Sequence, residues 1–326
     1  MKAIKFTQYG SPDVLQLADV DKPTPKAGEV LVKVHAASAN PLDWHIMRGE
    51  PFLARLEYGL RRPQHLFLGA DVAGMVEAVG EGVTRFRPGD AVFGETFHSA
   101  LGSFAEYACV PETALVLKPD TVSFEAAAAV PVAALTALQG LRDKGKLRAG
   151  QRVLVNGAAG GVGTFAVQIA KALGAHVTAV CSGRNVDLVR SIGADDIIDY
   201  QRENFTDNAG QYDLILDLVG NHSVWALKRA LKPQGTAPIV GFTSLPRMFE
   251  HLIIGPLASA WGGKTVGMIG TVKASAEDLQ LLKEMLADGR IIPVIDRCYP
   301  LSQTAEAIRY LETARAKGKV VITVGA

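Results

Sequence analysis

The sequence predicts an α/β chain that combines a β-rich domain with a doubly wound parallel sheet. Residues 1 to about 118 contain short apolar stretches separated by Gly and Pro, a pattern typical of a barrel-like β domain. From Gln151 onward, short β-branched stretches alternate with helical periodicity, which indicates a parallel sheet covered by helices. A glycine-rich turn joins the first strand of that sheet to its first helix.

The expected elements follow in chain order. In the β-rich part, strands are expected at residues 29–36, 72–79, 91–94 and 104–110. Composition shifts at about Pro119, and Ser123 is placed to cap a helix that breaks at Pro131 and then resumes. The parallel sheet is expected to have strands near residues 152–156, 176–181, 196–199, 213–218, 237–241 and 265–272. A helix over 276–286, a strand over 290–296, a helix over 302–315 and a strand over 319–324 finish the chain, and the N-terminal β domain is the obvious host for the last two strands.

Composition excludes several classes of protein. The chain has 326 residues, with 34 Lys and Arg against 33 Asp and Glu, so it lacks the charge needed to attract nucleic acid or an anionic membrane. Cys109, Cys181 and Cys298 are odd in number and far apart, which argues against a disulfide framework and favours a reducing compartment. The N-terminus lacks the apolar core of a signal peptide. We therefore expect a soluble cytoplasmic protein with a small-molecule substrate.

The glycine-rich turn predicts a phosphate-binding site. Gly157, Gly160 and Gly163 separate the strand at 152–156 from a helix, and a second apolar strand follows at 176–181. This βαβ context suits a pyrophosphate, because the first turn of the helix presents unpaired N–H groups and the positive end of its dipole. The spacing is Gly-x-x-Gly-x-x-Gly, with Ala159 where a second fingerprint glycine would stand. The alternative is a turn that only packs a helix on a sheet.

The residues after the second strand indicate which dinucleotide binds. A site for NAD usually has Asp or Glu about 20 residues beyond the glycines, to hold the ribose 2′-hydroxyl. Here that stretch is Cys181-Ser182-Gly183-Arg184, and no carboxylate comes before Asp187. Ser182 and Arg184 can both bind a phosphate, so the sequence predicts NADPH rather than NADH. The alternative for Arg184 is a solvated loop cation.

Several motifs together resemble one superfamily. They are Asn40-Pro41-x-Asp43, Gly69-x-Asp71-x-Ala73-Gly74, Val83-x-x-Phe86-x-x-Gly89-Asp90-x-Val92, Gly102-Ser103-Phe104-Ala105-Glu106-Tyr107 and the glycine-rich turn. The chain resembles the medium-chain dehydrogenase/reductase superfamily over essentially its whole length, and is most similar to the zinc-free quinone oxidoreductase and enone reductase branch. The resemblance implies a GroES-like catalytic domain (residues 1–119 and 272–326) around an inserted Rossmann NADP-binding domain (residues 120–271). It also implies an active site in the cleft between the domains and a homodimer joined along the edge strand near Thr265 to Thr271.

The same resemblance predicts that no metal is bound. Alcohol dehydrogenases of the superfamily have a Cys near position 40 and Gly-His-Glu where this chain has Gly69-Ala70-Asp71. Here Asn40 stands in for the first ligand, and no His or Cys stands at the second, although zinc needs three protein ligands of suitable type. The histidines that could improvise a site, without any supporting spacing, are His35, His45, His65 and His98.

The expected cofactor residues fall into three groups. The glycine-rich turn supplies the pyrophosphate contacts, namely Gly157, Ala159, Gly160, Gly161 and Val162. Because ligands bind outside the carboxyl ends of parallel strands, the nicotinamide half is expected to be flanked by Val219, Gly241, Phe242 and Thr243. The resemblance adds Asn40 at the nicotinamide ribose, Thr136 near the nicotinamide and Tyr200 against the adenosine phosphate, and Lys319 is a further candidate anion partner.

Some of these residues also have a purely structural interpretation. Asn40 is a favoured N-cap residue, Pro41 a favoured first helical residue and Asp43 an acid in the first turn. Thr136 could bond its own helix backbone, and Gly241 could serve only a tight turn.

The catalytic candidates are His45, Asp43 and Ser103. His45 could donate a proton to substrate oxygen, since an imidazole titrates near neutral pH, although a partly buried helix histidine is the more ordinary interpretation. The resulting hypothesis is a reductase that transfers a hydride from NADPH to a quinone or an α,β-unsaturated carbonyl compound. The alternatives are a non-catalytic NADPH-binding redox sensor and an alcohol dehydrogenase with an unorthodox metal site.

Overall fold

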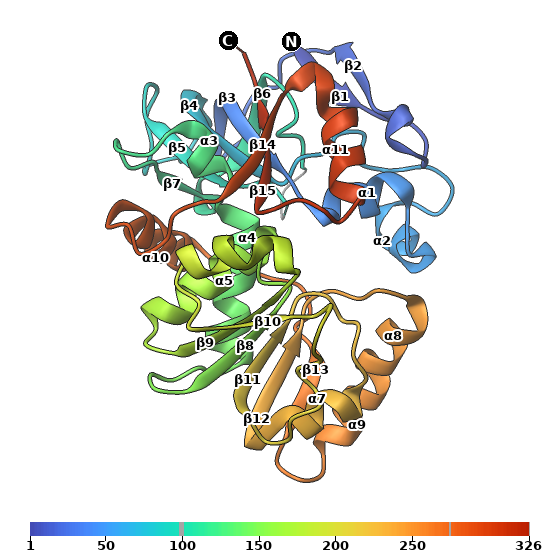
Figure 1. Cartoon of the computed structure of the whole chain (residues 1–326). Coiled ribbons are helices and arrows are strands. Elements are labelled where there is room, and N and C mark those ends of the chain that lie inside the picture. The colour runs from blue at the N-terminus through green and yellow to red at the C-terminus, as the bar shows by residue number, and fades with distance from the viewer. Residues whose placement is uncertain (98–100, 274, 326) are drawn as a thin grey trace. The chain divides into compact units, whose positions relative to one another are not determined.

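The computed structural model describes residues 1–97, 101–273 and 275–325. These residues form two compact units, which Figure 1 shows in ribbon form. Unit 1 contains residues 1–135, 273–289 and 293–326, and unit 2 contains residues 136–272 and 290–292. The predicted domain boundaries at 119/120 and 271/272 remain a prediction, since the units part at 135/136 and 272/273.

Unit 1 is built on a seven-stranded sheet with the strand order β14-β15-β3-β4-β5-β7, in which β6 also pairs with β3. The strands are β3 (Glu29–Ala39), β4 (Asp71–Val79), β5 (Ala91–Glu95), β6 (Tyr107–Pro111), β7 (Leu115–Leu117), β14 (Ile295–Pro300) and β15 (Lys319–Thr323). All pairs are antiparallel except β14 with β15. Strands β1 (Lys2–Lys5) and β2 (Gln16–Asp19) form a separate antiparallel pair. The C-terminal strands therefore join the N-terminal sheet, as predicted.

Short helices surround this sheet. The α-helices are α1 (Pro41–Arg48), α2 (Arg55–Tyr58), α3 (Phe124–Ala128), α10 (Ala276–Ala287) and α11 (Thr304–Glu312), and the 3₁₀ turns are η1 (Pro12–Val14), η2 (Phe52–Ala54), η3 (Glu112–Ala114) and η7 (Leu301–Gln303). Ser123 caps α3 as predicted, because its hydroxyl accepts from the Ala126 N–H at 3.1 Å. The core includes Val32 and Val72 from the sheet, Ile46 from α1 and Ile308 from α11.

Unit 2 contains a six-stranded, fully parallel sheet with the strand order β10-β9-β8-β11-β12-β13. The strands are β8 (Arg152–Asn156), β9 (His176–Cys181), β10 (Asp196–Asp199), β11 (Tyr212–Asp217), β12 (Leu231–Ile239) and β13 (Thr265–Met268). The helical elements are α5 (Gly161–Ala172), η5 (Gly183–Asn185), α6 (Val186–Ser191), α7 (Val224–Ala230), α8 (Leu245–Phe249), η6 (Glu250–Ile254) and α9 (Gly255–Ser259). The chain builds outward from β8 on one side and from β11 on the other, so the predicted doubly wound sheet is confirmed.

Helix α4 (Pro131–Gln139) spans the residues at which the two units part, and it continues as the π-helical turn η4 (Gly140–Lys144). Two glycines let this turn pack on the sheet of unit 2. A Cβ at Gly140 would lie 2.8 Å from Leu216 Cδ1, and a Cβ at Gly145 would lie 2.1 Å from Leu214 Cδ1. The helix expected to resume after Pro131 therefore ends in a widened turn pressed against β11.

Three predicted elements are displaced in the structure. The strand expected over 290–296 is β14, which starts only at Ile295. The Gln168 side chain accepts a hydrogen bond from Ile292 N at 2.8 Å and donates one to Ile292 O at 3.0 Å, so the backbone of Ile292 is not available for strand pairing. The strand expected over 265–272 ends at Met268, and Gly270 follows with φ +75°. The strand expected at 237–241 begins earlier, since Leu231 already pairs with Tyr212.

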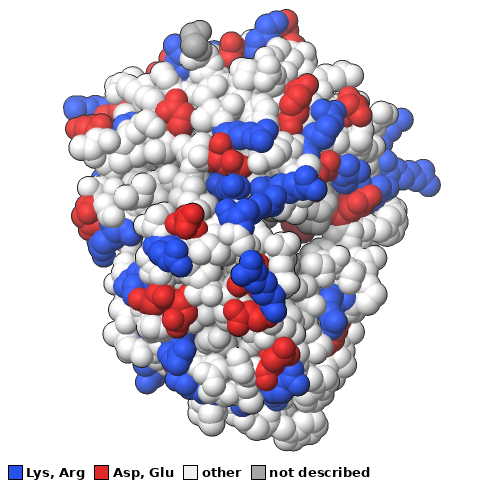
Figure 2. Space-filling view, in the orientation of Figure 1, with Lys and Arg blue, Asp and Glu red and all other residues white. Residues whose placement is uncertain are grey.

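Figure 2 shows Lys and Arg together with Asp and Glu over the face in view, in keeping with a net charge of +1. Within the described residues, no helix is both long and apolar enough to cross a membrane.

Candidate functional site

The glycine-rich turn of unit 2 follows the predicted geometry. Gly157 has φ +89°, and the N–H groups of Gly157 and Ala158 donate to Val180 O at 3.2 and 3.1 Å, so the turn folds across the end of β9. Gly160 is the N-cap of α5, with no side-chain cap and no acid in the first turn of the helix. The first N–H groups of α5 therefore have no acceptor within the helix, and the positive end of its dipole is not neutralised.

Close packing explains why the third glycine is needed. A Cβ at Gly163 would lie 2.1 Å from Gly157 O, whereas a Cβ at Gly160 would come no nearer than 3.5 Å to the same oxygen. Gly163 thus lets α5 pack close to the turn. The turn before the helix contains Ala159, and the first turn of α5 contains Gly161 and Val162. This arrangement suits a diphosphate held by backbone N–H groups.

A buried carboxylate organises the point at which the sheet changes direction. Strands β8 and β11 are neighbours there, and Asp217 Oδ1 accepts from Asn156 Nδ2 at 2.7 Å, from Gly220 N at 2.9 Å and from Val219 N at 3.1 Å. The turn after β11 is thereby tied to the end of β8. In open α/β sheets this switch point is where ligands bind.

The turns after β11 and β12 lie against each other and against Gly157. A Cβ at Gly220 would lie 2.1 Å from Gly241 O, and a Cβ at Gly157 would lie 2.9 Å from Val219 Cγ2. Thr243 Oγ1 donates to Gly220 O at 3.4 Å. The structure therefore brings Gly157, Val219, Gly241 and Thr243 together at one edge of the sheet, with Phe242 next along the chain.

The ends of β9 and β10 bring together the residues predicted for the adenosine end of the cofactor. Ser182 is buried, while Arg184 is exposed and has no hydrogen bond or ion pair within the described part of the chain. The Tyr200 side chain is 61% exposed, and its backbone N–H donates to Cys181 O at 3.1 Å. Ser182, Arg184 and Tyr200 therefore share one edge, although Tyr200 comes from a different strand.

A carboxylate that the sequence analysis missed lies at this edge. Asp199 ends β10 and pairs in register with Cys181 at the end of β9. Its Oδ2 would lie 2.8 Å from a Cβ at Gly183. Counting along the chain from the glycines could not identify it, because it comes from the neighbouring strand; its position directly before Tyr200 was the available signal.

In unit 1 the candidate residues form a buried polar network. Lys319 on β15 is 3% exposed, and its Nζ donates to Asn40 Oδ1 at 2.6 Å and lies 3.4 Å from Asp71 Oδ2. Asn40 Nδ2 donates to Asp71 Oδ2 at 2.8 Å, and Ser38 Oγ donates to the same oxygen at 2.5 Å. Val132 N donates to Asp71 Oδ1 at 2.7 Å.

This network changes the interpretation of Lys319. The expected anion partner is buried and engaged by two neighbours of its own unit, so its ammonium orients Asn40 and neutralises Asp71 instead of facing solvent. The cause is tertiary: β15 pairs antiparallel with β3, which brings residues from the two ends of the chain together.

Asp43 is fully buried, and both of its oxygens accept backbone N–H groups. Oδ2 accepts from Asn40 N at 2.8 Å, and Oδ1 accepts from Gly69 N at 2.9 Å. Burial raises the pKa of Asp43 to about 7, with the Asp71 carboxylate adding to that effect, while the two N–H groups and Lys319 oppose it. These contacts fit a residue that fixes the start of α1 and the Gly69 turn better than one that touches substrate.

His45 is half-buried in α1, with its ring stacked on Trp44 at 3.6 Å between centroids. Its Nδ1 lies 2.7 Å from Glu50 O, and because a carbonyl only accepts, we infer that Nδ1 carries the proton of the neutral ring. Burial lowers the pKa of His45. In the neutral imidazole, Nε2 is then an acceptor, so His45 can donate from Nε2 only when the ring is protonated.

The two remaining candidates are buried. The Ser103 side chain is fully buried, and its hydroxyl has no hydrogen-bond partner among residues 1–97, 101–273 and 275–325. It would lie 2.4 Å from a Cβ at Gly69, which places it beside the turn that Asp43 holds. Thr136 is buried within α4.

At the positions that the resemblance assigns to zinc, the side chains contact an ammonium group. Asn40 and Asp71 both contact the Lys319 ammonium. Ala70, which stands where the alcohol dehydrogenases have His, has no side chain that could bind a metal. No cluster of three or more His, Cys, Asp or Glu suited to a metal occurs within the described ranges. His98, one of the histidines considered above, lies outside the described residues.

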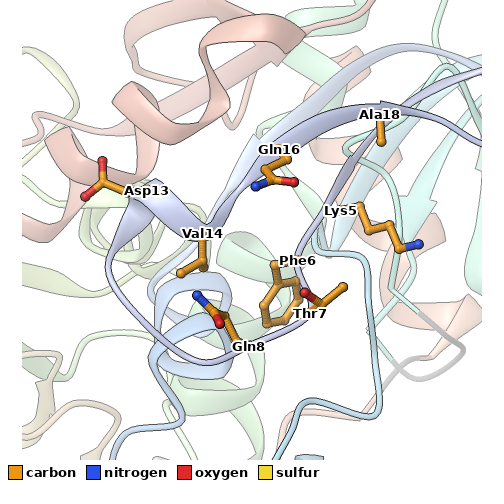
Figure 3. A pocket seen from close by; sticks show the side chains of 8 residues that line it. All are labelled: Lys5, Phe6, Thr7, Gln8, Asp13, Val14, Gln16 and Ala18. Atoms are coloured by element: carbon orange, nitrogen blue, oxygen red, sulfur yellow. The ribbon is translucent and has the colours of Figure 1, made fainter.

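A surface hollow of about 320 Å³ lies beside β1 and β2 in unit 1 (Figure 3). Its lining residues are Lys5, Phe6, Thr7, Gln8, Asp13, Val14, Gln16 and Ala18. None of the candidate residues contributes to it, so it does not mark the site.

Comparisons with known proteins define the class. Residues 26–120 match the model of the alcohol dehydrogenase GroES-like domain, and residues 192–322 match that of the zinc-binding dehydrogenase family. The chain is 37% identical to 2-methylene-furan-3-one reductase of Solanum lycopersicum, covering 99% of this chain and 79% of that protein. It is 35% identical to an NADPH-dependent alkenal/one oxidoreductase, chloroplastic, of Arabidopsis thaliana, again over 99% and 79%.

A solved structure is similar over the full length. The quinone oxidoreductase of Coxiella burnetii has a TM-score of 0.86 and 32% sequence identity, covering 100% of this chain and 99% of that one. The chain belongs to the medium-chain dehydrogenase/reductase superfamily, in its quinone oxidoreductase and enone reductase branch. The predicted pairing of a GroES-like domain with a Rossmann domain is therefore confirmed.

Proposed function

We propose that this chain is an NADPH-dependent oxidoreductase that reduces a quinone or an α,β-unsaturated carbonyl compound without zinc. The observation that carries the proposal is the uncapped start of α5 at the switch point of the sheet, beside an exposed arginine with no partner in the described residues. The names of the relatives support it, since one is an NADPH-dependent alkenal/one oxidoreductase and another a quinone oxidoreductase.

Different groups of residues are proposed to bind different parts of NADPH. The first turn of α5 and the Gly157 turn hold the diphosphate, and Ser182, Arg184 and Tyr200 hold the adenosine phosphate. Val219, Gly241, Phe242, Thr243 and Thr136 flank the nicotinamide half. When bound, NADPH supplies the hydride. Asn40, held by Lys319 and Asp71, is proposed for the nicotinamide ribose, as the resemblance implies.

The donor set supports a reaction without zinc. A zinc ion would have to displace the Lys319 ammonium from Asn40 and Asp71, and an amide with one carboxylate falls short of the three ligands that zinc requires. Charge developing on substrate oxygen must then be met by a hydroxyl, a backbone N–H, an imidazolium or water. Ser103 and His45 remain the proposed side chains, His45 only in its protonated form.

The test is NADPH oxidation by the purified protein in the presence of EDTA, with paired panels of quinones and enones and with NADH as the comparison. Turnover that prefers NADPH and is insensitive to EDTA supports the proposal and identifies the acceptor class. Tight NADPH binding without turnover on either panel would favour the redox sensor. Loss of activity on adding EDTA would favour the alcohol dehydrogenase with an unorthodox metal site.

We also propose a homodimer formed along β13. This strand ends the sheet order, so one side of it has no strand partner in the described chain. Large apolar side chains are exposed in the adjoining segment 245–261, including Leu252, Ile253, Leu257 and Trp261, and few charged residues cover α8 and α9 in Figure 2. Sedimentation of the Leu257→Glu and Trp261→Glu variants tests this proposal, since a monomer is expected only in the variants.

The predicted cytoplasmic location remains a prediction. The Arabidopsis relative is named as chloroplastic, which gives cytoplasm no support. Fractionation of the source cells, with the protein detected by antibody, checks it.

A further inference from the structure

Asp199 occupies the edge of the sheet at which the adenosine end of the cofactor is proposed to bind. It is the last residue of β10, in register with Cys181 at the end of β9, so its side chain starts level with the Ser182-Gly183-Arg184 stretch. Burial, together with the nearby Asp199 carboxylate, raises the pKa of the Cys181 thiol to about 11. Both the strand register and the raised pKa of Cys181 therefore place the Asp199 carboxylate beside the end of β9.

The local backbone keeps the carboxylate in place. Gln201 N donates to Asp199 Oδ1 at 3.1 Å, and the N–H groups of Arg202 and Glu203 donate to Asp199 O at 2.9 and 3.1 Å. Gly183 leaves the space that Asp199 Oδ2 needs, since a Cβ there would be 2.8 Å away. The carboxylate is thus set against the residue that immediately precedes Arg184.

Its neutralisation is weak. Arg202 Nε lies 3.6 Å from Asp199 Oδ2, but the Arg202 side chain is 86% exposed, and such surface pairs contribute little. Asp199 itself is 16% exposed, so a small part of its carboxylate reaches solvent. The end of β10 therefore presents a carboxylate at the same edge of the sheet at which the exposed Arg184 follows β9.

These two groups prefer different ligands. A guanidinium binds a phosphate, whereas a carboxylate accepts a hydrogen bond from a ribose 2′-hydroxyl and repels a 2′-phosphate. We propose that Asp199 is the specificity-determining residue that limits the preference for NADPH over NADH, an inference that rests on the proposed function. The acid that the sequence lacks at the end of β9 is thus supplied by the next strand.

The test measures binding, by titration calorimetry, of two probes that differ only in the 2′-phosphate: 2′,5′-ADP and 5′-AMP. For Asp199→Asn, we expect 2′,5′-ADP to bind roughly five-fold more tightly, and 5′-AMP to bind unchanged or more weakly. The gain should shrink between 50 mM and 500 mM salt, because added ions screen partly exposed charges. A merely structural role would not produce this salt dependence.

Asp187→Asn is the matched control. Asp187 lies in α6, just beyond the same edge, and its side chain is fully exposed, so the variant loses the same charge away from Gly183. Its ratio of affinities should change less than two-fold. Asn at position 199 keeps an oxygen for the Gln201 N–H, and thermal unfolding of both variants checks that they are folded.

The outcomes separate the inference from the proposed function. If the unchanged protein prefers 2′,5′-ADP but the ratio in Asp199→Asn stays within two-fold of it, the inference is overturned and the proposed function stands. If the unchanged protein binds neither NADPH nor 2′,5′-ADP, both are overturned. If Asp187→Asn changes the ratio of the two affinities more than Asp199→Asn does, the change reflects the net charge of the region and not the position of Asp199. That result would overturn the inference and leave the proposed function standing.

Discussion

The polar edge of unit 2 and the polar network of unit 1 use similar side chains in opposite ways. In unit 2, Arg184 is exposed and forms no hydrogen bond or ion pair within the described chain, and no side chain caps the start of α5. In unit 1, Lys319, Asn40 and Asp71 satisfy one another out of contact with solvent. Arg184, which is proposed to bind the cofactor, has no partner among the described residues, whereas the polar side chains of the unit 1 network form their hydrogen bonds and ion pairs with one another.

The largest effect is expected from removing the buried ammonium. Lys319→Met leaves Asp71 as an uncompensated buried charge, so the free energy of unfolding should fall by about 3–5 kcal/mol in urea titrations. Lys171→Met is the control, because Lys171 pairs with Asp195 at 2.8 Å in a solvent-accessible position and should cost less than about 1 kcal/mol. Equal losses would contradict the contrast between the two regions.

A pH effect of the same network is expected from Asp43. Its pKa is raised to about 7, so its contribution to stability is fully present below the unfolded value near 4 and is lost as the pH rises toward 7. The destabilisation caused by Asp43→Asn should therefore shrink by on the order of 2 kcal/mol between pH 5 and pH 8. Urea unfolding of both proteins at the two pH values measures it, and a constant difference would contradict the raised pKa.

The glycine turn offers a matched pair of substitutions. Gly163→Ala places a Cβ 2.1 Å from Gly157 O, so we expect a loss of about 1–3 kcal/mol in unfolding free energy and at least roughly ten-fold weaker NADPH binding. Gly160→Ala meets nothing closer than 3.5 Å and should leave stability nearly unchanged. Similar behaviour of the two variants would mean that the approach of α5 does not shape the site.

A smaller effect, confined to binding, is expected at Arg184. Arg184→Gln should weaken NADPH binding about ten-fold, because a charge-assisted hydrogen bond to phosphate is lost. NADH binding and the unfolding midpoint should stay unchanged, since the exposed side chain forms no hydrogen bond or ion pair within the described chain. Fluorescence titration with both cofactors distinguishes this from a general loss of affinity.

The smallest effect is expected at His45. At pH 7.5, His45→Gln should change turnover less than about three-fold, because the neutral imidazole has no proton on Nε2 to donate. The measurement is kcat for the best acceptor at pH 5.5 and pH 7.5. A loss of more than about 30-fold at the higher pH would make His45 the proton donor there after all.

Local features could be predicted from the sequence. The strand, glycine turn and helix between residues 152 and 172 and the Ser123 cap depend on residues close together in the chain. Even the clustering of Val219, Gly241 and Thr243 followed from a general rule, because the carboxyl ends of parallel strands share one edge.

Features that depend on partners distant in sequence could not be predicted. The count from the glycines missed Asp199, which reaches Gly183 only because β10 pairs with β9. Lys319 was expected to bind an anion of the cofactor, but β15 pairs with β3 and places its ammonium against Asn40 and the Asp71 carboxylate. The start of β14 depended on Gln168, whose side chain takes the backbone of Ile292.

The sequence by itself determined the class of fold, the glycine-rich turn between β8 and α5 and the residues proposed for the adenosine phosphate, because glycine spacing and hydrophobic periodicity act over a few residues. Only the tertiary structure decided which of the charged groups are exposed and which are buried against their own neighbours. Strand pairing buried Lys319 and left Arg184 exposed, and burial, which no local pattern encodes, determines whether a charge binds outward or holds its own neighbours.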